Sequence, residues 1–229
     1  MIQNLPLYII VVFILTALLT VGIFQYAMKR GSFSSSTTKF LIFALPFWLI
    51  FQATVAYFGF YVSEPLRLPF FAVLPAIITI ICLFIFSRDW IAKLPLQTLT
   101  LIHIFRIPVE LCLLWLFKAG QIPQIMTFEG RNFDIIVGIT APIIAWFAFR
   151  NGNVNRLLLI VWNVFALILL ANIVSTAVLS IQSPIQKFGF EQPNVAVLYF
   201  PFIWLPAVIV PIVLFSHLAS LYRLFDKSN

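Results

Sequence analysis

The chain has 229 residues, of which 62% are hydrophobic and only 9% are charged, with a formal net charge of +7 and a mean hydropathy of +1.08. Roughly a quarter of the residues of a soluble domain are charged, so this composition excludes an ordinary soluble protein and indicates an integral membrane protein. The basic residues lie at the ends of apolar runs and form no basic domain, which favours a lipid bilayer over nucleic acid as the partner.

Seven apolar segments have lengths near the roughly 20 residues that cross a hydrocarbon core of about 30 Å. They are residues 5–27, 39–61, 68–86, 97–118, 133–149, 157–180 and 195–222. No linker, charge run or low-complexity stretch separates them, so we expect a single transmembrane domain over residues 1–229. The predicted fold is all-α, a polytopic bundle of seven transmembrane helices.

The distribution of lysine and arginine between the loops predicts the orientation of this bundle, because short cytoplasmic loops are enriched in both residues. One set of loops contains nine of them: Lys29, Arg30, Lys39, Arg88, Lys93, Arg150, Arg156, Arg223 and Lys227. The other set contains four: Arg67, Lys118, Arg131 and Lys187. We therefore expect the N-terminus outside and the C-terminus inside.

The segment 97–118 carries ionisable residues although it is long enough to cross the bilayer. At 100° per residue, His103, Arg106 and Glu110 lie within about 60° of one another on a helix. A charged side chain near the bilayer centre costs at least ~2.5–3.5 kcal/mol, so this stripe is expected to face protein or trapped water. Pro108 removes a backbone donor within the same helix. Such a disturbed, charged helix indicates a functional site, with a structural Arg106–Glu110 ion pair as the alternative.

A second polar cluster follows between the fourth and fifth segments. Residues 119–132 are too apolar at their start for a free loop and too short for a further crossing, so they are expected to lie in the interface or to re-enter the membrane. The cluster consists of Glu129, Arg131, Asn132 and Asp134. Because the connection is short, the cluster should lie near Glu110 and complete a substrate-binding or proton-coupling site with both signs of charge.

The two histidines of the chain, His103 and His217, are predicted at similar depths of the fourth and seventh segments. Two imidazoles that face each other across a bundle can ligate haem b or, with Cys82, a metal ion. The alternative is that each histidine forms local hydrogen bonds and that the two never meet.

Prolines recur every five residues near the start of the seventh segment, at Pro201, Pro206 and Pro211. Each removes a backbone hydrogen bond, so this helix is expected to be bent or partly unwound.

Three stretches resemble a group of uncharacterised small bacterial multi-span membrane proteins. They are Met126–Asp134, Phe200-Pro-Phe-Ile-Trp-Leu-Pro206 and Ser216-His-Leu-Ala-Ser220. The resemblance covers roughly the second half of the chain, from Leu101. It implies a multi-pass protein of the bacterial inner (plasma) membrane and supplies no activity, substrate or cofactor.

The leading functional hypothesis is a small-solute or ion-coupled transporter or channel-like protein. In it Glu110 binds a proton, Arg106 is its partner or contacts an anion, and Arg131 and Asp134 gate or bind from outside. The alternatives are a haem- or metal-binding redox protein that uses His103 and His217, an intramembrane enzyme acting on lipid, and a structural or assembly subunit. A structural or assembly subunit would have a partner protein in a membrane complex. The sequence is also compatible with a homo-oligomer. The absence of a nucleophile motif in the sequence argues against an enzyme.

Overall fold

The computed structural model describes residue 2 and residues 5–226, and in this part of the chain all regular structure is helical. The α-helices are α1 (Leu7–Ser32), α2 (Ser36–Tyr57), α3 (Phe60–Ser63), α4 (Leu74–Phe86), α5 (Arg88–Ala92), α6 (Leu96–Leu101), α7 (Arg106–Lys118), α8 (Asp134–Ala148), α9 (Arg156–Leu179) and α10 (Val210–Phe225). Short 3₁₀ turns are η2 (Ile102–Phe105), η3 (Gln124–Met126), η4 (Arg150–Gly152) and η5 (Ala196–Leu198). Two π-helical turns, η1 (Pro69–Val73) and η6 (Leu205–Ile209), lead directly into α4 and α10.

Six helical stretches of the described chain are long and apolar enough to cross a membrane. They are 7–32, 36–57, 69–86, 96–118, 156–179 and 205–225. The protein is therefore a multi-pass membrane protein built from helices. Of the expected segments, 133–149 is represented by the shorter helix α8, whose 15 residues rise by only about 22 Å. By length alone, α8 does not cross a 30 Å core.

The seventh expected segment, 195–222, differs most from its predicted extent. Residues 200–203 form turns, a π-helical turn follows at Leu205–Ile209, and the regular helix begins only at Val210. Proline cannot donate a backbone hydrogen bond, and its ring crowds the preceding helical turn. The expectation that Pro201, Pro206 and Pro211 disturb this helix is confirmed.

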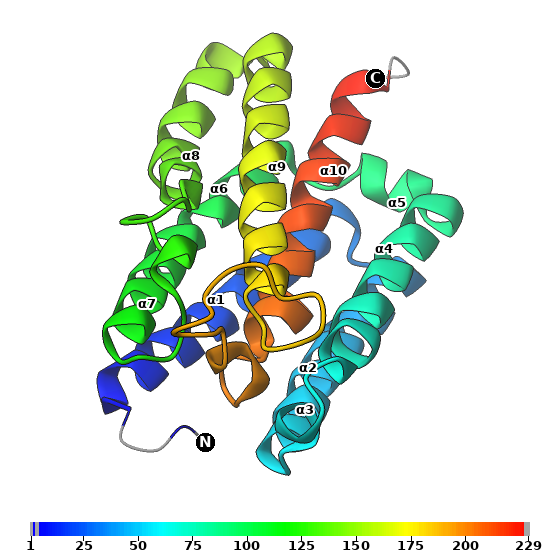
Figure 1. The fold of residues 1–229 in the computed structure, drawn as a ribbon. Coiled ribbons are helices and arrows are strands. Elements are labelled where there is room, and N and C mark those ends of the chain that lie inside the picture. Colours follow the sequence, from blue (N-terminus) through cyan, green and yellow to red (C-terminus); the bar gives the residue numbers. More distant parts are fainter. Residues whose placement is uncertain (1, 3–4, 227–229) are drawn as a thin grey trace.

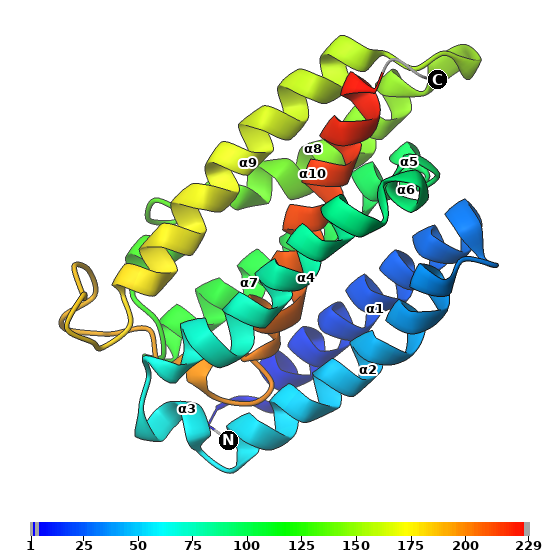
Figure 2. The same ribbon diagram turned by 90° about the vertical axis from the view of Figure 1, so that its right-hand side faces the viewer.

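Helix α10 lies near the centre of the bundle, where it contacts α9, α6, α5 and α4 (Figures 1 and 2). The stretches 96–118 and 205–225 are the most deeply buried of the six apolar stretches. Helix α1 packs against α7, α8 packs against α6 and α7, and α9 lies between α8 and α10. Helix α2 lies at the periphery, where it packs on α1 and α3.

The loops that connect the helices lie at the two ends of the bundle. Helix α1 begins at the end of the bundle where α7 ends, and α10 ends at the opposite end (Figure 1). The loops 33–35, 87–95 and 149–155 lie at the end of the bundle where α10 ends. These loops contain or border most of the basic residues that were used to predict the orientation. Lys227, one of those nine, lies outside the described residues.

Candidate intramembrane polar site

The stretch 96–118 is interrupted at its middle by a 3₁₀ turn. Pro108 has no N–H to bond the carbonyl of Ile104, and the chain tightens into η2, Ile102–Phe105, immediately before α7. The backbone N–H of Arg106 bonds the carbonyl of His103. This break places both of these side chains inside the bundle, where His103 is fully buried and Arg106 is 4% exposed.

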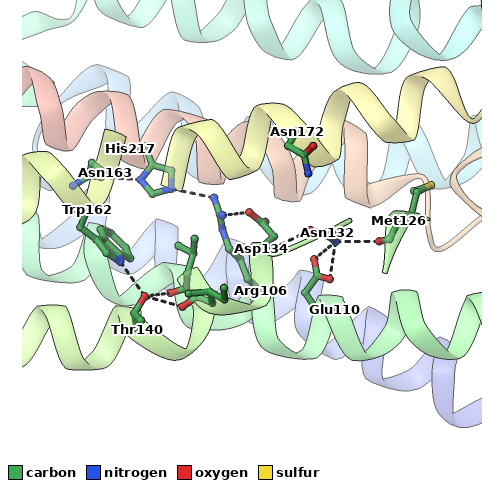
Figure 3. Close-up of polar contacts among 12 residues, drawn as sticks. Arg106, Glu110, Met126, Asn132, Asp134, Thr140, Trp162, Asn163, Asn172 and His217 are labelled. Carbon is green, nitrogen blue, oxygen red and sulfur yellow. Dashed lines mark hydrogen bonds and ion pairs between the residues drawn. The ribbon is translucent and has the colours of Figure 1, made fainter. Parts of the chain in front are cut away.

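Arg106 forms the centre of the site. Its Nη1 atom forms an ion pair with Oδ1 of Asp134, the first residue of α8, and both side chains are buried. Its Nη2 atom lies 3.0 Å from Nε2 of His217 on α10 (Figure 3). The guanidinium thus joins three helices. Its acidic partner is Asp134 rather than Glu110, so the Arg106–Glu110 ion pair considered from the sequence gives way to a pairing between helices.

The hydrogen bonds of His217 define its tautomer. A guanidinium can only donate, so Nε2 of His217 accepts from Arg106. The remaining proton is then on Nδ1, which lies 2.7 Å from Oδ1 of Asn163 on α9. The amide nitrogen of Asn163 donates to the carbonyl of Leu159 at 2.8 Å, which is consistent with this orientation of the amide. His217 is therefore a neutral link between Arg106 and α9.

Glu110 lies one turn further along α7 and has a different partner. The Nδ2 atom of Asn132 lies 2.7 Å from both Oε1 and Oε2 of Glu110 and also donates to the carbonyl of Met126 at 3.0 Å. The Oδ1 atom of Asn132 accepts from the backbone N–H of Asp134 at 3.0 Å. One asparagine thus connects the Glu110 carboxyl to the residue that pairs with Arg106, and Figure 3 shows these contacts as a row.

The segment that carries Asn132 returns along α7 toward the middle of the bundle (Figure 1). Asn172 of α9 donates to the carbonyl of Arg131 at 2.8 Å. The carbonyl of Gln121 accepts from the backbone N–H groups of Val195 and Ala196, and Gln192 donates to the carbonyl of Ile122 at 2.6 Å. The 119–133 segment is therefore held by α9 and by the 180–204 loop.

The position of Arg106 along its own helical stretch gives the depth of the site. Arg106 comes about ten residues after Leu96 and about twelve before Lys118, or roughly 15 Å and 18 Å of helical rise. The ion pair therefore lies near the middle of the 96–118 stretch, and α8 begins at that level. Gly138 permits the close approach of α8, because a Cβ there would lie 2.8 Å from Cγ1 and 3.0 Å from N of Ile107.

Comparison with known protein families identifies a match to the family described as "Domain of unknown function (DUF8737)", over residues 65–225. This is more than half of the chain. The protein belongs to the DUF8737 family. No curated protein and no solved structure matches the chain. The matched range includes all the residues that form the polar site and leaves out α1 and α2. Membership agrees with the resemblance to uncharacterised proteins, and the description of the DUF8737 family states no activity.

In this DUF8737 protein the two histidines do meet, but face to face. The rings of His103 and His217 are nearly parallel, with centroids 3.8 Å apart and an interplanar angle of 13°. Axial ligation of haem requires two ring nitrogens that point at the iron from opposite sides of a porphyrin. Stacked rings leave no space for a porphyrin, and both nitrogens of His217 are already engaged. These residues do not fit haem, and in the described part of the chain no three metal-ligating side chains gather.

His103 is the least satisfied polar residue of the site. Within the described residues neither of its ring nitrogens has a hydrogen-bond partner, although the side chain is fully buried. Its ring contacts Trp162 edge-on, with centroids 5.4 Å apart, in addition to stacking on His217. Buried polar atoms are almost always paired, so this imidazole marks a place where water or a polar solute would supply hydrogen bonds.

The structure brings together only part of the predicted site. Arg106, Glu110, Asn132 and Asp134 form one network with both histidines. The side chains of Glu129 and Arg131 are exposed and lie outside this network.

Sequence reasoning missed Asn163 as a partner of His217 and the carbonyl of Met126 as a partner of Asn132. Asn163 is a polar residue in an apolar run, which is a usable signal. A carbonyl partner leaves no signal in the sequence.

Proposed function

We propose that the protein is a proton-coupled transporter of a small polar solute in the inner membrane of a bacterium, with Glu110 as the proton-binding group. The observation that carries this proposal is the buried polar network at the middle of the bundle, at the level where α8 begins. Intramembrane ionisable residues usually mark substrate, ion or proton pathways, because burying them for structure alone is costly.

The charge balance of the network supports a proton-binding role. Two buried carboxyl groups, Glu110 and Asp134, face one buried guanidinium, and His217 must be neutral at Nε2 to accept from Arg106. An unbalanced charge in a dry interior is expensive, so binding of one proton by a carboxyl group would neutralise the site. Asp134 pairs directly with Arg106, which leaves Glu110 as the group that gains and loses the proton.

The architecture of the fifth expected crossing supports a transport role. Helix α8 covers only part of a bilayer, and the irregular 119–133 segment contacts α7 through the bond from Asn132 to Glu110. Non-helical backbone at membrane depth is tolerated where protein buries it or where it lines a cavity. Transporters use such broken crossings to form midplane binding sites. We therefore count α8 with the re-entrant 119–133 segment as the seventh crossing, which places the two termini on opposite sides of the membrane. The excess of lysine and arginine in the loops nearer the C-terminal end then favours an outside N-terminus and an inside C-terminus.

The structure corresponds in this proposal to a closed state. Glu110 is 2% exposed, and the 119–133 segment lies between it and the outer end of the bundle. Outward movement of this segment would break the Asn132–Glu110 contact and admit a solute to Asp134 and Arg106. Arg131 and Glu129, which are exposed, would contact the solute at the entrance. Donors and acceptors of both charges suit a zwitterionic or strongly hydrogen-bonding solute.

A solute screen on reconstituted protein tests this proposal. Proteoliposomes would be screened on a solid-supported membrane with a panel of amino acids, small carboxylates and polyols, each at two pH values. The expected result is a pH-dependent current for one class of solute that Glu110→Gln abolishes. Glu129→Gln removes an exposed carboxyl from the same region and should retain the current. A current equal in Glu110→Gln and wild type would contradict the assigned role.

A further inference from the structure

The peripheral helix α2 is attached to the rest of the bundle by hydrogen bonds in both of its halves. In the first half, Trp90 donates to Oγ1 of Thr38 at 2.8 Å, and Gln25 donates to the carbonyl of Ile42 at 3.1 Å. In the second half, Trp48 donates to the carbonyl of Ala207 at 3.0 Å, and Trp204 donates to the carbonyl of Leu49 at 2.9 Å. One turn later, Gln52 donates to the carbonyl of Phe71 at 2.9 Å. The bonds of the second half join α2 to η1 and η6.

Between Trp48 and the start of α2, the helix borders an apolar cavity of about 230 Å³. Its walls come from α1, α2, α4, η6 and α10, and include Phe24, Leu45, Leu83 and Phe215. Trp48, which is fixed by its bond to Ala207, lines the cavity at its far end.

The cavity continues toward the end of the bundle where α10 ends. Phe40, Leu41, Thr79 and Leu83 line both the cavity and a second hollow between α2 and α4, which extends to Ser36 and Ser87. The distance along α2 from Ser36 to Trp48 is twelve residues, or about 18 Å of rise. This is close to the roughly 15 Å that one leaflet contributes to a 30 Å hydrocarbon core.

The groove opens into a polar mouth. Thr37, Phe86 and Ser87 line both the second hollow and a polar hollow of about 530 Å³. Its remaining lining includes serines 32, 34 and 35 together with Arg88, Asp89 and Lys93. Two cationic side chains against one carboxylate, surrounded by hydroxyl groups, form a setting for an anionic phosphate ester. The mouth lies at the end of the bundle that is richer in basic residues.

We propose that this continuous groove binds one membrane phospholipid with an anionic headgroup. The phosphate lies in the mouth at Arg88 and Lys93, and one acyl chain follows α2 and α4 to Trp48. The order of a charged mouth and an apolar groove of about one leaflet's length matches the order of groups in a phospholipid. The proposal stands on α2, α4 and α10 and does not depend on the transport function.

Native mass spectrometry of the full chain tests this site directly. The protein would be exchanged from nanodiscs of equal parts phosphatidylglycerol and phosphatidylcholine into detergent, and the retained lipids counted. We expect one tightly retained phosphatidylglycerol. Arg88→Glu/Lys93→Glu should lower its retention by about tenfold or more, since each cationic residue at such a surface contributes about 1 kcal/mol. Lys39→Glu/Arg150→Glu changes the same charge at the same end, outside the groove, and should retain it.

A second pair of variants tests the acyl-chain path. Ala44→Trp places a large side chain in the cavity and should lower lipid retention by a similar factor, whereas Phe43→Trp lies on the exposed neighbouring face and should not. Equal retention of both lipids, or unchanged retention in Arg88→Glu/Lys93→Glu, would show that the retained lipid is only non-specific lipid from the surrounding bilayer. Either result would overturn the proposal. A wild-type dimer that Ala44→Trp converts to monomer without loss of lipid would assign the groove to a second copy and also overturn it.

Discussion

The Nη2 atom of Arg106 lies 3.0 Å from Nε2 of His217, and this contact determines which nitrogen of the imidazole carries the proton. Because the guanidinium only donates, Nε2 accepts and Nδ1–H donates to Asn163. We expect ¹⁵N NMR of histidine-labelled protein at neutral pH to show His217 as the Nδ1-protonated tautomer, with His103→Phe used to assign the signals. An Nε2-protonated His217 would show that Arg106 does not donate to it.

The ion pair between Arg106 and Asp134 should be strongly coupled. Removing one partner leaves an uncompensated buried charge, so Asp134→Asn or Arg106→Gln is expected to lower the free energy of unfolding by about 3–5 kcal/mol. The double variant should recover much of this loss. The free energy of unfolding of the wild type, the two single variants and the double variant can be measured in mixed detergent by separating folded from unfolded protein. Additive losses in the double variant would show that the two groups do not interact.

Gly138 is predicted to control how closely α8 approaches α7. Gly138→Ala places a Cβ 3.0 Å from the backbone nitrogen of Ile107, which cannot move aside like a flexible side chain. The expected cost is about 1–3 kcal/mol of unfolding free energy. Gly22→Ala is the matched control, because nothing lies within 4 Å of a Cβ at that helical position. If both variants unfold at the same temperature, the absence of a side chain at Gly138 does not determine how closely α8 approaches α7.

Cysteine labelling tests the proposed topology. In a background with Cys82→Ala and Cys112→Ala, Glu129→Cys and Val154→Cys place exposed thiols at the two ends of α8 and its preceding segment. An odd number of crossings with an outside N-terminus predicts that a membrane-impermeant maleimide labels Glu129→Cys from outside and Val154→Cys only after lysis. Labelling of both thiols from the same side would contradict counting α8 and the 119–133 segment as a crossing.

The sequence predicted the membrane class because apolar composition and segment length depend only on the chain. It also predicted that His103, Arg106 and Glu110 share one face, since helical periodicity is a local property. The partner of Arg106 was not predictable in this way. Glu110, four residues away on the same helix, and Asp134, on another helix, were both possible partners of Arg106. The close approach of α8 to α7 at Gly138 allows Asp134 to form the ion pair.

Residue types also failed to show how the histidines would be used. Two imidazoles at one depth suggested ligation, but their relative orientation depends on the 3₁₀ turn at Ile102–Phe105 and on the bond from Arg106 to His217. The extent of the last helix was overestimated because apolar composition continues through residues 195–204, where a short 3₁₀ turn at Ala196–Leu198 and a turn at 200–203 precede the helix. Composition reports the environment of a segment and does not report its backbone conformation.

The most direct test of the proton-binding role is an infrared titration of the carboxyl groups in reconstituted wild-type protein, with Glu110→Gln and Glu129→Gln measured in parallel. We predict a protonated carboxyl band that changes with pH in wild type and in Glu129→Gln and is absent in Glu110→Gln. Addition of a transported solute should shift the midpoint of that change. If the titrating band persists unchanged in Glu110→Gln, Glu110 does not bind the coupling proton, and the proposed mechanism is wrong.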